Sequence, residues 1–275
     1  GDVMKNGIHL DLAEDTYHAD PGSISKTGLW TLHSKTPAHF KFAPPREPTP
    51  TLGFGKAVHM AVLEPKRAKG MLVKGPPNRR GNAWKDFQAV VEERGLFLLT
   101  EPEYDSVLEI QAAAQKHPII AKLNKTDIIY EASAFWKDEA TGQQCRVRPD
   151  IYAPKLKIMT DLKTSADASA WNWAKTASNL GYHVQEAMYT EGWQEAGGGD
   201  VDAFIFIVIE QKAPYCTAVY EFEPSASVEG SAVFRKALEQ YKECKKADHW
   251  PGYSEQIQPI DLPHFAYRET DSPNL

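Results

Sequence analysis

Arg148-Pro149-Asp150, followed after a ten-residue interval by Asp161-Leu162-Lys163, is the stretch that decides the fold. Apolar residues flank both triplets, so each is expected at the end of a short strand. Asp161 and Lys163 are two positions apart, which puts their side chains on one face of a strand and directs Leu162 into apolar packing. Two carboxylates beside an ammonium group are suited to hold a divalent cation next to a phosphate and to make a nucleophile from water. The same side chains could form a surface salt bridge on a hairpin, and the spacing alone leaves that alternative open.

The sequence around these triplets predicts an α/β fold. Strands are expected at residues 128–137, 145–152 and 157–163, with a hairpin turn at 138–142 joining the first two. Residues 166–195 are expected to be helical with a break near 179–181, followed by strands at 203–210 and 215–222 and a helix at 225–246. This order predicts a mixed central β-sheet flanked by helices, an arrangement that resembles the core of restriction endonucleases.

The first half of the chain is expected to be mainly helical. Residues 1–20 have the pattern of an irregular lead-in, and the turn at 20–23 begins a helix. A proline-rich connection at 44–50 precedes expected helices at 53–64, 84–94 and 102–116. We therefore predict one domain over residues 1–275, with a helical part at about 20–125, a catalytic α/β core at about 126–246 and an extended tail at 247–275.

The amino-acid composition limits the classes of protein to which this chain can belong. Of 275 residues, 42% are hydrophobic and 25% charged, which is typical of a globular protein. Neither a membrane span nor the apolar core of a signal peptide is expected. The three cysteines are widely spaced and odd in number, so we expect free thiols, no four-cysteine cluster and a cytoplasmic location in a bacterial or phage-infected cell.

The net charge of −6 argues against a nucleic-acid partner, but the charges are unevenly distributed. Seven basic residues and no acidic residue lie between Pro65 and Lys85. Arg79 and Arg80 in this basic strip are candidate contacts to DNA phosphates. A solvated loop explains the same charges equally well.

Other polar residues are candidates to complete the Asp150–Lys163 site. Glu131 lies on the preceding expected strand, and His59 lies on the expected helix at 53–64. A structural role is the commoner one for a single helical histidine. Gln185 and Tyr189 are four residues apart on an expected helix and so share a face, which serves either packing or contact with a phosphate or base.

Taken together, these segments resemble the PD-(D/E)xK nuclease superfamily, and within it the RecE-type (exonuclease VIII-like) enzymes of phages and prophages. The similar blocks are YHADPGSIS at 17–25, GFGKAVH at 53–59, RPD at 148–150, DLKTSADA at 161–168 and GYHVQEAMY at 181–189.

The resemblance implies a role for each candidate residue. Asp150 and Asp161 would bind Mg²⁺ or Mn²⁺, the Leu162 carbonyl would face the metal, and His59 and Glu131 would complete or support its site. Lys163 would serve the nucleophilic water. The remaining implied site residues are Gln185 and Tyr189, which match a Gln-x-x-x-Tyr motif, and Ser23, Ser25 and Lys26 at a helix start that would hold a 5′ phosphate.

The resemblance also implies an activity and partners. The protein would digest linear double-stranded DNA from a 5′ end and leave a 3′ single strand for recombination. It would assemble as a ring-shaped homo-oligomer, a trimer or tetramer, around DNA ends, with a single-strand annealing protein as companion and no membrane partner. A structure-specific endonuclease of the same fold and a non-catalytic DNA-binding or assembly protein are the alternatives.

Overall fold

A five-stranded mixed sheet forms the centre of the computed structural model, which describes residues 4–44 and 50–267. The strand order is β10 (Thr217–Tyr220), β9 (Ala203–Glu210), β8 (Ile158–Ser165), β7 (Ile151–Ala153) and β4 (Ile129–Tyr130). β8 and β9 run parallel, and the other neighbouring pairs are antiparallel. The predicted mixed sheet flanked by helices is confirmed.

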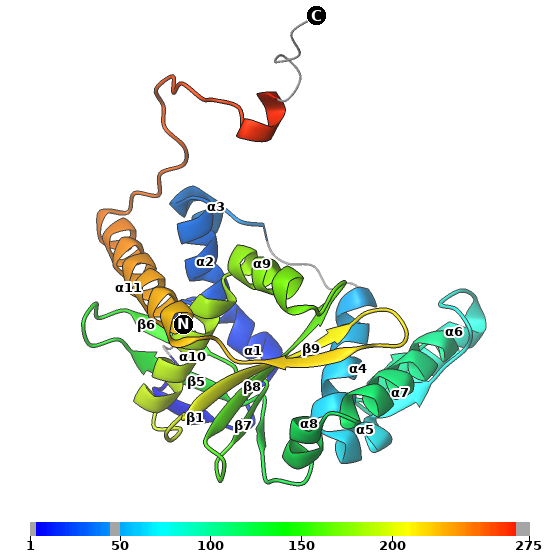
Figure 1. Cartoon of the computed structure of the whole chain (residues 1–275). Coiled ribbons are helices and arrows are strands. Elements are labelled where there is room, and N and C mark those ends of the chain that lie inside the picture. Colours follow the sequence, from blue (N-terminus) through cyan, green and yellow to red (C-terminus); the bar gives the residue numbers. More distant parts are fainter. Residues whose placement is uncertain (1–3, 45–49, 268–275) are drawn as a thin grey trace, which may run out of the picture.

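Helices cover both faces of this sheet (Figure 1). The apolar run of β9 explains why: Phe204 and Phe206 pack into one hydrophobic cluster, whereas Ile205 and Ile207 pack into the other. A strand buried on both faces needs apolar residues at consecutive positions. The first cluster lies under α2 (Lys26–Ser34), α9 (Ala170–Leu180), α10 (Tyr182–Glu195) and α11 (Pro224–Ala247). The second lies under α4 (Pro50–Leu63), α5 (Pro65–Met71), α7 (Glu101–Gln115) and α8 (Pro118–Leu123).

Two expected strands are each divided between two sheets, which corrects the sequence prediction. The segment at 128–137 forms β4 in the central sheet and β5 (Ser133–Lys137) in a second sheet of order β1–β5–β6. The segment at 145–152 forms β6 (Gln144–Val147) in the second sheet and β7 in the central one. The first division occurs at Glu131, whose φ is 48°, and the second at Arg148-Pro149-Asp150, where proline has no N–H for a ladder. Both divisions place polar residues at one junction between the sheets, where Glu131 pairs with Arg148.

The predicted break in the long helical segment is confirmed at Gly181. This residue ends α9 and begins α10 with φ of 67°, and a Cβ there would lie 2.4 Å from the Trp30 ring. Glycine therefore permits both the left-handed conformation and the close approach of α2. The turn fixes the direction of α10, which brings Gln185 to Asp161 of β8.

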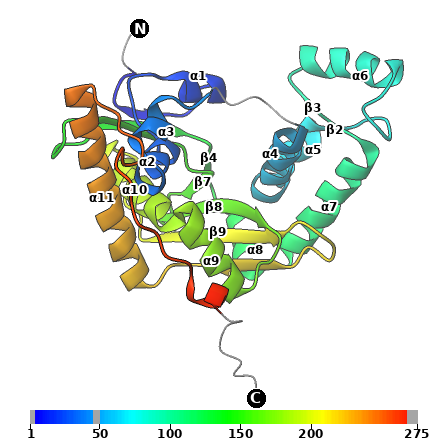
Figure 2. The ribbon, with the colours of Figure 1, turned by 90° about the horizontal axis from the view of Figure 1, so that it is seen from above.

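The N-terminal half contains more regular structure than expected. The lead-in forms β1 (Gly7–His9) and α1 (Glu14–Ala19), so its prediction as irregular was wrong. α3 (Pro37–Lys41) follows α2, and the expected connection at 44–50 lies mostly outside the described residues. An arm beside α7 holds a parallel strand pair that the sequence did not predict, seen at the right of Figure 2. Its elements are β2 (Leu72–Lys74), α6 (Asn82–Glu93) and β3 (Phe97–Leu99).

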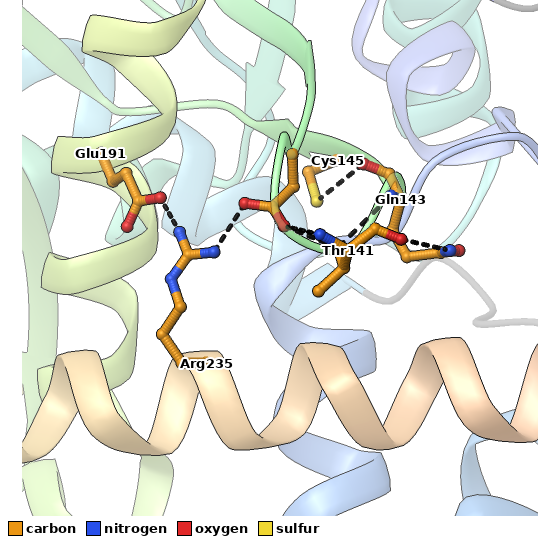
Figure 3. A network of polar contacts seen from close by, with 6 residues as sticks. Thr141, Gln143, Cys145, Glu191 and Arg235 are labelled. Atoms are coloured by element: carbon orange, nitrogen blue, oxygen red, sulfur yellow. Dashed lines mark hydrogen bonds and ion pairs between the residues drawn. The ribbon is translucent and has the colours of Figure 1, made fainter.

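Arg235 on α11 ties the helical layer to the second sheet (Figure 3). Its guanidinium pairs with Glu191 of α10 and donates to Asp138 Oδ1 at 2.6 Å. The other oxygen of Asp138 accepts hydrogen bonds from the amide and hydroxyl of Thr141 in the β5–β6 turn. This network holds α10 in register with the hairpin that ends at the sheet junction.

The C-terminal segment beyond α11 is exposed over residues 251–264 and ends in a short 3₁₀ turn, η1 (His264–Tyr267). Cys145 and Cys244 are buried free thiols, and Cys216 is an exposed one. Within residues 4–44 and 50–267, none of the helices is long and apolar enough to cross a membrane.

Candidate active site

β8 presents Asp161 and Lys163 on one face, as the two-residue spacing predicts. Lys163 Nζ lies 2.7 Å from Asp161 Oδ2, and Leu162 between them is buried in the opposite cluster. Gln185 of α10 donates from Nε2 to Asp161 Oδ1 at 2.8 Å. Asp161 and Gln185 are each only 4% exposed, so the carboxylate is held in a nearly dry setting.

Asp150 lies beside this pair because β7 begins where β8 reaches Thr160. Its Oδ2 accepts the Leu162 amide N–H at 2.7 Å, so the carboxylate continues the ladder where the β7 backbone has ended. In an extended strand the N–H and C=O of one residue point to the same edge. The Leu162 carbonyl therefore faces the side on which Asp150 lies.

His59 of α4 contacts Asp150 directly. Its Nε2 lies 3.2 Å from Asp150 Oδ2, and its Nδ1 is 2.9 Å from the Gly55 carbonyl. Burial would lower the pKa of His59, but the Asp150 carboxylate raises it to about 9. In this arrangement the ring is a cation that donates from both nitrogens and holds the carboxylate.

The pKa values of Asp150 and Asp161 are shifted in opposite directions. Burial raises the pKa of Asp161, and the neighbouring charge of Asp150 raises it further. Burial would also raise the pKa of Asp150, but His59 outweighs it and holds that pKa below its usual value. Burial would lower the pKa of Lys163, yet Asp161 keeps it above the usual value. Lys163 is therefore an ammonium group, able to donate hydrogen bonds and to neutralise negative charge.

A cleft of about 460 Å³ opens in front of Asp150, and several predicted site residues line it. Tyr189 borders the cleft from α10, and burial raises its pKa well above the usual value. Ser25 and Lys26 border it from the start of α2, where Ser25 caps the helix by accepting from the Gly28 amide. The cleft thus joins the predicted metal zone to the predicted phosphate zone.

Lys26 is more closely tied to the site than the sequence indicated. Its Nζ donates to the Leu180 carbonyl at 2.6 Å and lies 5.5 Å from the Tyr182 ring centroid. Lys163 Nζ lies 4.3 Å from the same ring. Burial and the neighbouring Lys163 lower the pKa of Lys26 to about 7. Tyr182 was not predicted as a site residue, although it stands three positions before Gln185 in the same motif.

Glu131 reaches the cleft but is held by Arg148, a second residue that sequence reasoning did not single out. The ion pair spans 3.7 Å, and Arg148 also donates to the Ser133 hydroxyl at 2.7 Å and to the Leu12 carbonyl at 3.0 Å. Burial raises the pKa of Glu131. Arg148 is the first residue of the Arg148-Pro149-Asp150 motif, and its place beside Asp150 in the sequence could have indicated a role in the site.

Three predicted DNA contacts lie elsewhere. Ser23 is buried, and its hydroxyl is bonded to Asp20 and Arg146 rather than directed into the cleft. Arg79 and Arg80 lie in the loop before α6, in the arm at the far right of Figure 2. Three of the seven basic residues in the strip are paired with acidic residues. These pairs are Arg67 with Glu64, Lys74 with Asp105 and Arg79 with Glu103.

The donor set fits a hard divalent cation, although not the full predicted ligand set. In the described part of the chain, no three His, Cys, Asp or Glu side chains are grouped closely enough to hold a metal. His59 contacts Asp150, and Glu131 pairs with Arg148. Asp161 Oδ2 is buried, and among the described residues no donor forms a well-directed hydrogen bond to it. Lys163 Nζ lies 2.7 Å from this oxygen as an ion-pair partner. Mg²⁺ commonly uses one or two carboxylates and completes its shell with water and substrate oxygens. Asp150, Asp161 and the Leu162 carbonyl match that pattern.

Comparisons with known proteins show the fold and the family of this chain. A solved structure from Eubacterium rectale, described as a candidate exonuclease, covers 95% of this chain and 100% of its own, with a TM-score of 0.61 and 13% identity. A phage-related exonuclease from Haemophilus somnus 129PT covers 79% of this chain and 82% of its own, at 11% identity and a TM-score of 0.36. No curated protein matches the sequence. The model of the "PDDEXK-like domain of unknown function (DUF3799)" matches residues 33–263. The chain therefore belongs to this PDDEXK-like family and is a member of the PD-(D/E)xK nuclease superfamily.

Proposed function

We propose that this protein is a metal-dependent exodeoxyribonuclease of the RecE type. It digests linear double-stranded DNA from the 5′ end and leaves 3′ single strands for recombination. The observation that carries the proposal is the buried Asp161 carboxylate, held between Lys163 and Gln185, with Asp150 bonded alongside through the Leu162 amide. The overall fold shared with an exonuclease-named structure supports the same reaction class.

Asp150, Asp161 and the Leu162 carbonyl would hold Mg²⁺ or Mn²⁺. When bound there, such a cation neutralises phosphate charge and lowers the pKa of water. Lys163, charged and 2.7 Å from Asp161, orients the attacking water and donates to a phosphate oxygen as negative charge grows. Gln185 keeps Asp161 in place, and His59 keeps Asp150 in place.

The cleft residues position the DNA end. Tyr189 is a neutral phenol, so it can donate a hydrogen bond to a phosphate without repelling it. Ser25 and Lys26 lie at the other side of the cleft, next to the N-terminus of α2. A 5′-terminal phosphate bound there would place the next phosphodiester toward Asp150. This arrangement accounts for an enzyme that acts from an end.

Digestion of matched linear and closed circular duplexes tests the proposal. With Mg²⁺, we expect the linear 5′-phosphorylated duplex to be degraded and the circle to remain intact. Asp161→Asn and Lys163→Ala should each lower the rate at least about 100-fold. Asp127→Asn removes an exposed carboxylate from a surface pair with Lys155 and serves as the control.

Two other functions predict different outcomes of this assay. Nicking of the circle would indicate the structure-specific endonuclease. Binding of DNA ends without digestion, in Mg²⁺ and in Mn²⁺, would indicate the non-catalytic DNA-binding or assembly protein. Full activity of Asp161→Asn would contradict the assignment of the site.

The partners are proposed on the same basis. A ring-shaped trimer or tetramer would enclose DNA ends in a channel, which reconciles DNA binding with a net charge of −6 if basic faces line the channel. Light scattering of the purified protein should then give three or four times the 30.7 kDa chain mass. A single-strand annealing protein would take up the 3′ strand, and co-purification of the two proteins from a common host checks this.

A further inference from the structure

A second cavity lies across the Glu131–Arg148 ion pair from the active-site cleft. Its volume is about 580 Å³, and the same two residues line both cavities. The second cavity is bounded by β4, by the α4–α5 junction and by the loop before α1. Figure 2 shows β4 between α1 on one side and α4 on the other. The two cavities therefore adjoin at Glu131 and Arg148.

The lining of the second cavity suits a nucleobase. Tyr130 lies under Arg67, whose guanidinium carbon is 5.6 Å from the ring centroid. Flat aromatic rings and guanidinium groups are the two surfaces on which unpaired bases stack. One nitrogen of Arg67 pairs with Glu64 at 3.0 Å, and one face of the guanidinium lies over Tyr130. The side chain is 52% exposed, so the other face is open to a base. Leu10 and Leu12 supply apolar edges on the opposite side.

The order of the residues indicates which nucleotide is bound. If Ser25 and Lys26 hold the terminal 5′ phosphate, the first nucleotide occupies the cleft and its 3′ phosphate reaches Asp150. The strand then continues past Arg148 into the second cavity. Sites for single small molecules range over roughly 300–1,000 Å³, so the cavity has room for one nucleoside.

We propose that the cavity lined by Tyr130 and Arg67 binds the base of the second nucleotide from the 5′ end, on the far side of the cleaved bond. This inference rests on the proposed function and names a specific subsite of the substrate. The base leaves its duplex partner and stacks against the Arg67–Tyr130 pair. The strand is thereby anchored downstream of Asp150 while the terminal nucleotide is removed.

Abasic residues placed one at a time at positions 1, 2 and 3 of a 5′-phosphorylated strand test the proposal. Two readouts are used: release of the first nucleotide from duplex DNA with Mg²⁺, and anisotropy of a labelled single strand bound to the metal-free protein. We expect an abasic residue at position 2 to weaken both by about tenfold, the effect of one lost base-stacking contact. An abasic residue at position 1 or 3 should weaken both readouts less than one at position 2.

Two variants distinguish a loss of base stacking in the second cavity from a general loss of folding. Arg67→Ala, at an exposed position, and Tyr130→Leu should each weaken action on intact DNA by about tenfold and abolish the further penalty of the abasic residue at position 2. Lys242→Ala, on α11 and outside both cavities, should keep the full penalty.

Equal binding of intact and position-2 abasic strands by the wild-type protein would overturn the inference. So would a penalty that survives in Arg67→Ala. If the wild-type protein digests intact DNA while these results are negative, the proposed function stands and only the subsite fails. A position-2 penalty in metal-free binding, without any digestion, would support the subsite and contradict the exonuclease.

Discussion

Replacing Gln185 with leucine removes the amide that donates to Asp161 Oδ1 at 2.8 Å. Both residues are 4% exposed, so water cannot readily replace the lost donor. A hydrogen bond to a charged group contributes about 1.5–3 kcal/mol, against about 0.5–1.5 kcal/mol for one between neutral groups. Gln111→Leu is the matched control, because that amide donates at 2.7 Å to the neutral Ala61 carbonyl. We expect Gln185→Leu to destabilise the protein by at least about 1 kcal/mol more than Gln111→Leu.

Urea unfolding of the metal-free protein at pH 8 and at pH 4.5 measures this difference. The pKa of Asp161 is already raised by burial and by Asp150, and loss of the amide raises it further. When the pKa of a carboxyl group is raised in the folded state, the protein becomes less stable as pH rises through that pKa. The additional destabilisation by Gln185→Leu should therefore be large at pH 8 and smaller at pH 4.5. Equal costs for the two variants at pH 8 would refute the reasoning, as would a difference that does not change with pH. With Mg²⁺, Gln185→Leu should also digest linear DNA about tenfold more slowly, since Asp161 is less often ionised and in place.

Three further predictions concern the scaffold and its pH dependence. Gly230→Ala places a Cβ 2.1 Å from a backbone oxygen of α10, so thermal unfolding should show a loss of about 2 kcal/mol, whereas Gly53→Ala meets nothing within 4 Å and should be neutral or slightly stabilising. Arg235→Ala removes both ion pairs of that residue, one with a buried carboxylate, and should cost about 2 kcal/mol in urea unfolding, while Lys155→Ala breaks only an exposed pair and should leave the unfolding free energy nearly unchanged. His59 has a folded-state pKa of about 9, above its ordinary 6.5, so its contribution to the stability of the metal-free protein is full below pH 6.5 and is lost as pH rises through 9. A His59→Gln variant should lack that loss, and a wild-type unfolding free energy that decreases no more than the variant's between pH 6.5 and 9 would contradict the assignment.

Local pattern was a reliable guide where one element decides the geometry. The two-residue spacing of Asp161 and Lys163 predicts a shared face, and their contact at 2.7 Å follows from the pleat of a single strand. The uninterrupted apolar run of β9 predicts burial on both faces, and the break at Gly181 is a property of one residue without a Cβ. In each case the covalent chain brings the relevant atoms together, so no distant contact is needed.

Pattern was a poor guide where a strand changes partners. The periods of residues 128–137 and 145–152 are those of continuous strands, yet both divide between two sheets. Alternation of apolar and polar residues indicates which face of a sheet each side chain occupies. It does not indicate the strand with which the backbone pairs. The same divisions bring Glu131 and Arg148 to the cleft, where they form the ion pair between the two cavities.

The sequence by itself determined the motif of the candidate site, because Asp150, Asp161 and Lys163 lie within fourteen positions, just before one strand and on the strand that adjoins it. Only the tertiary structure decided what surrounds them. Gln185 reaches Asp161 across 24 positions, and Lys26 reaches the carbonyl beside Gly181 across 154. The acidic start of α7 pairs with Lys74 and Arg79, two of the seven basic residues in the strip. Such contacts depend on how helices pack on the sheet, and packing is set by the shapes of many side chains together rather than by spacing along the chain.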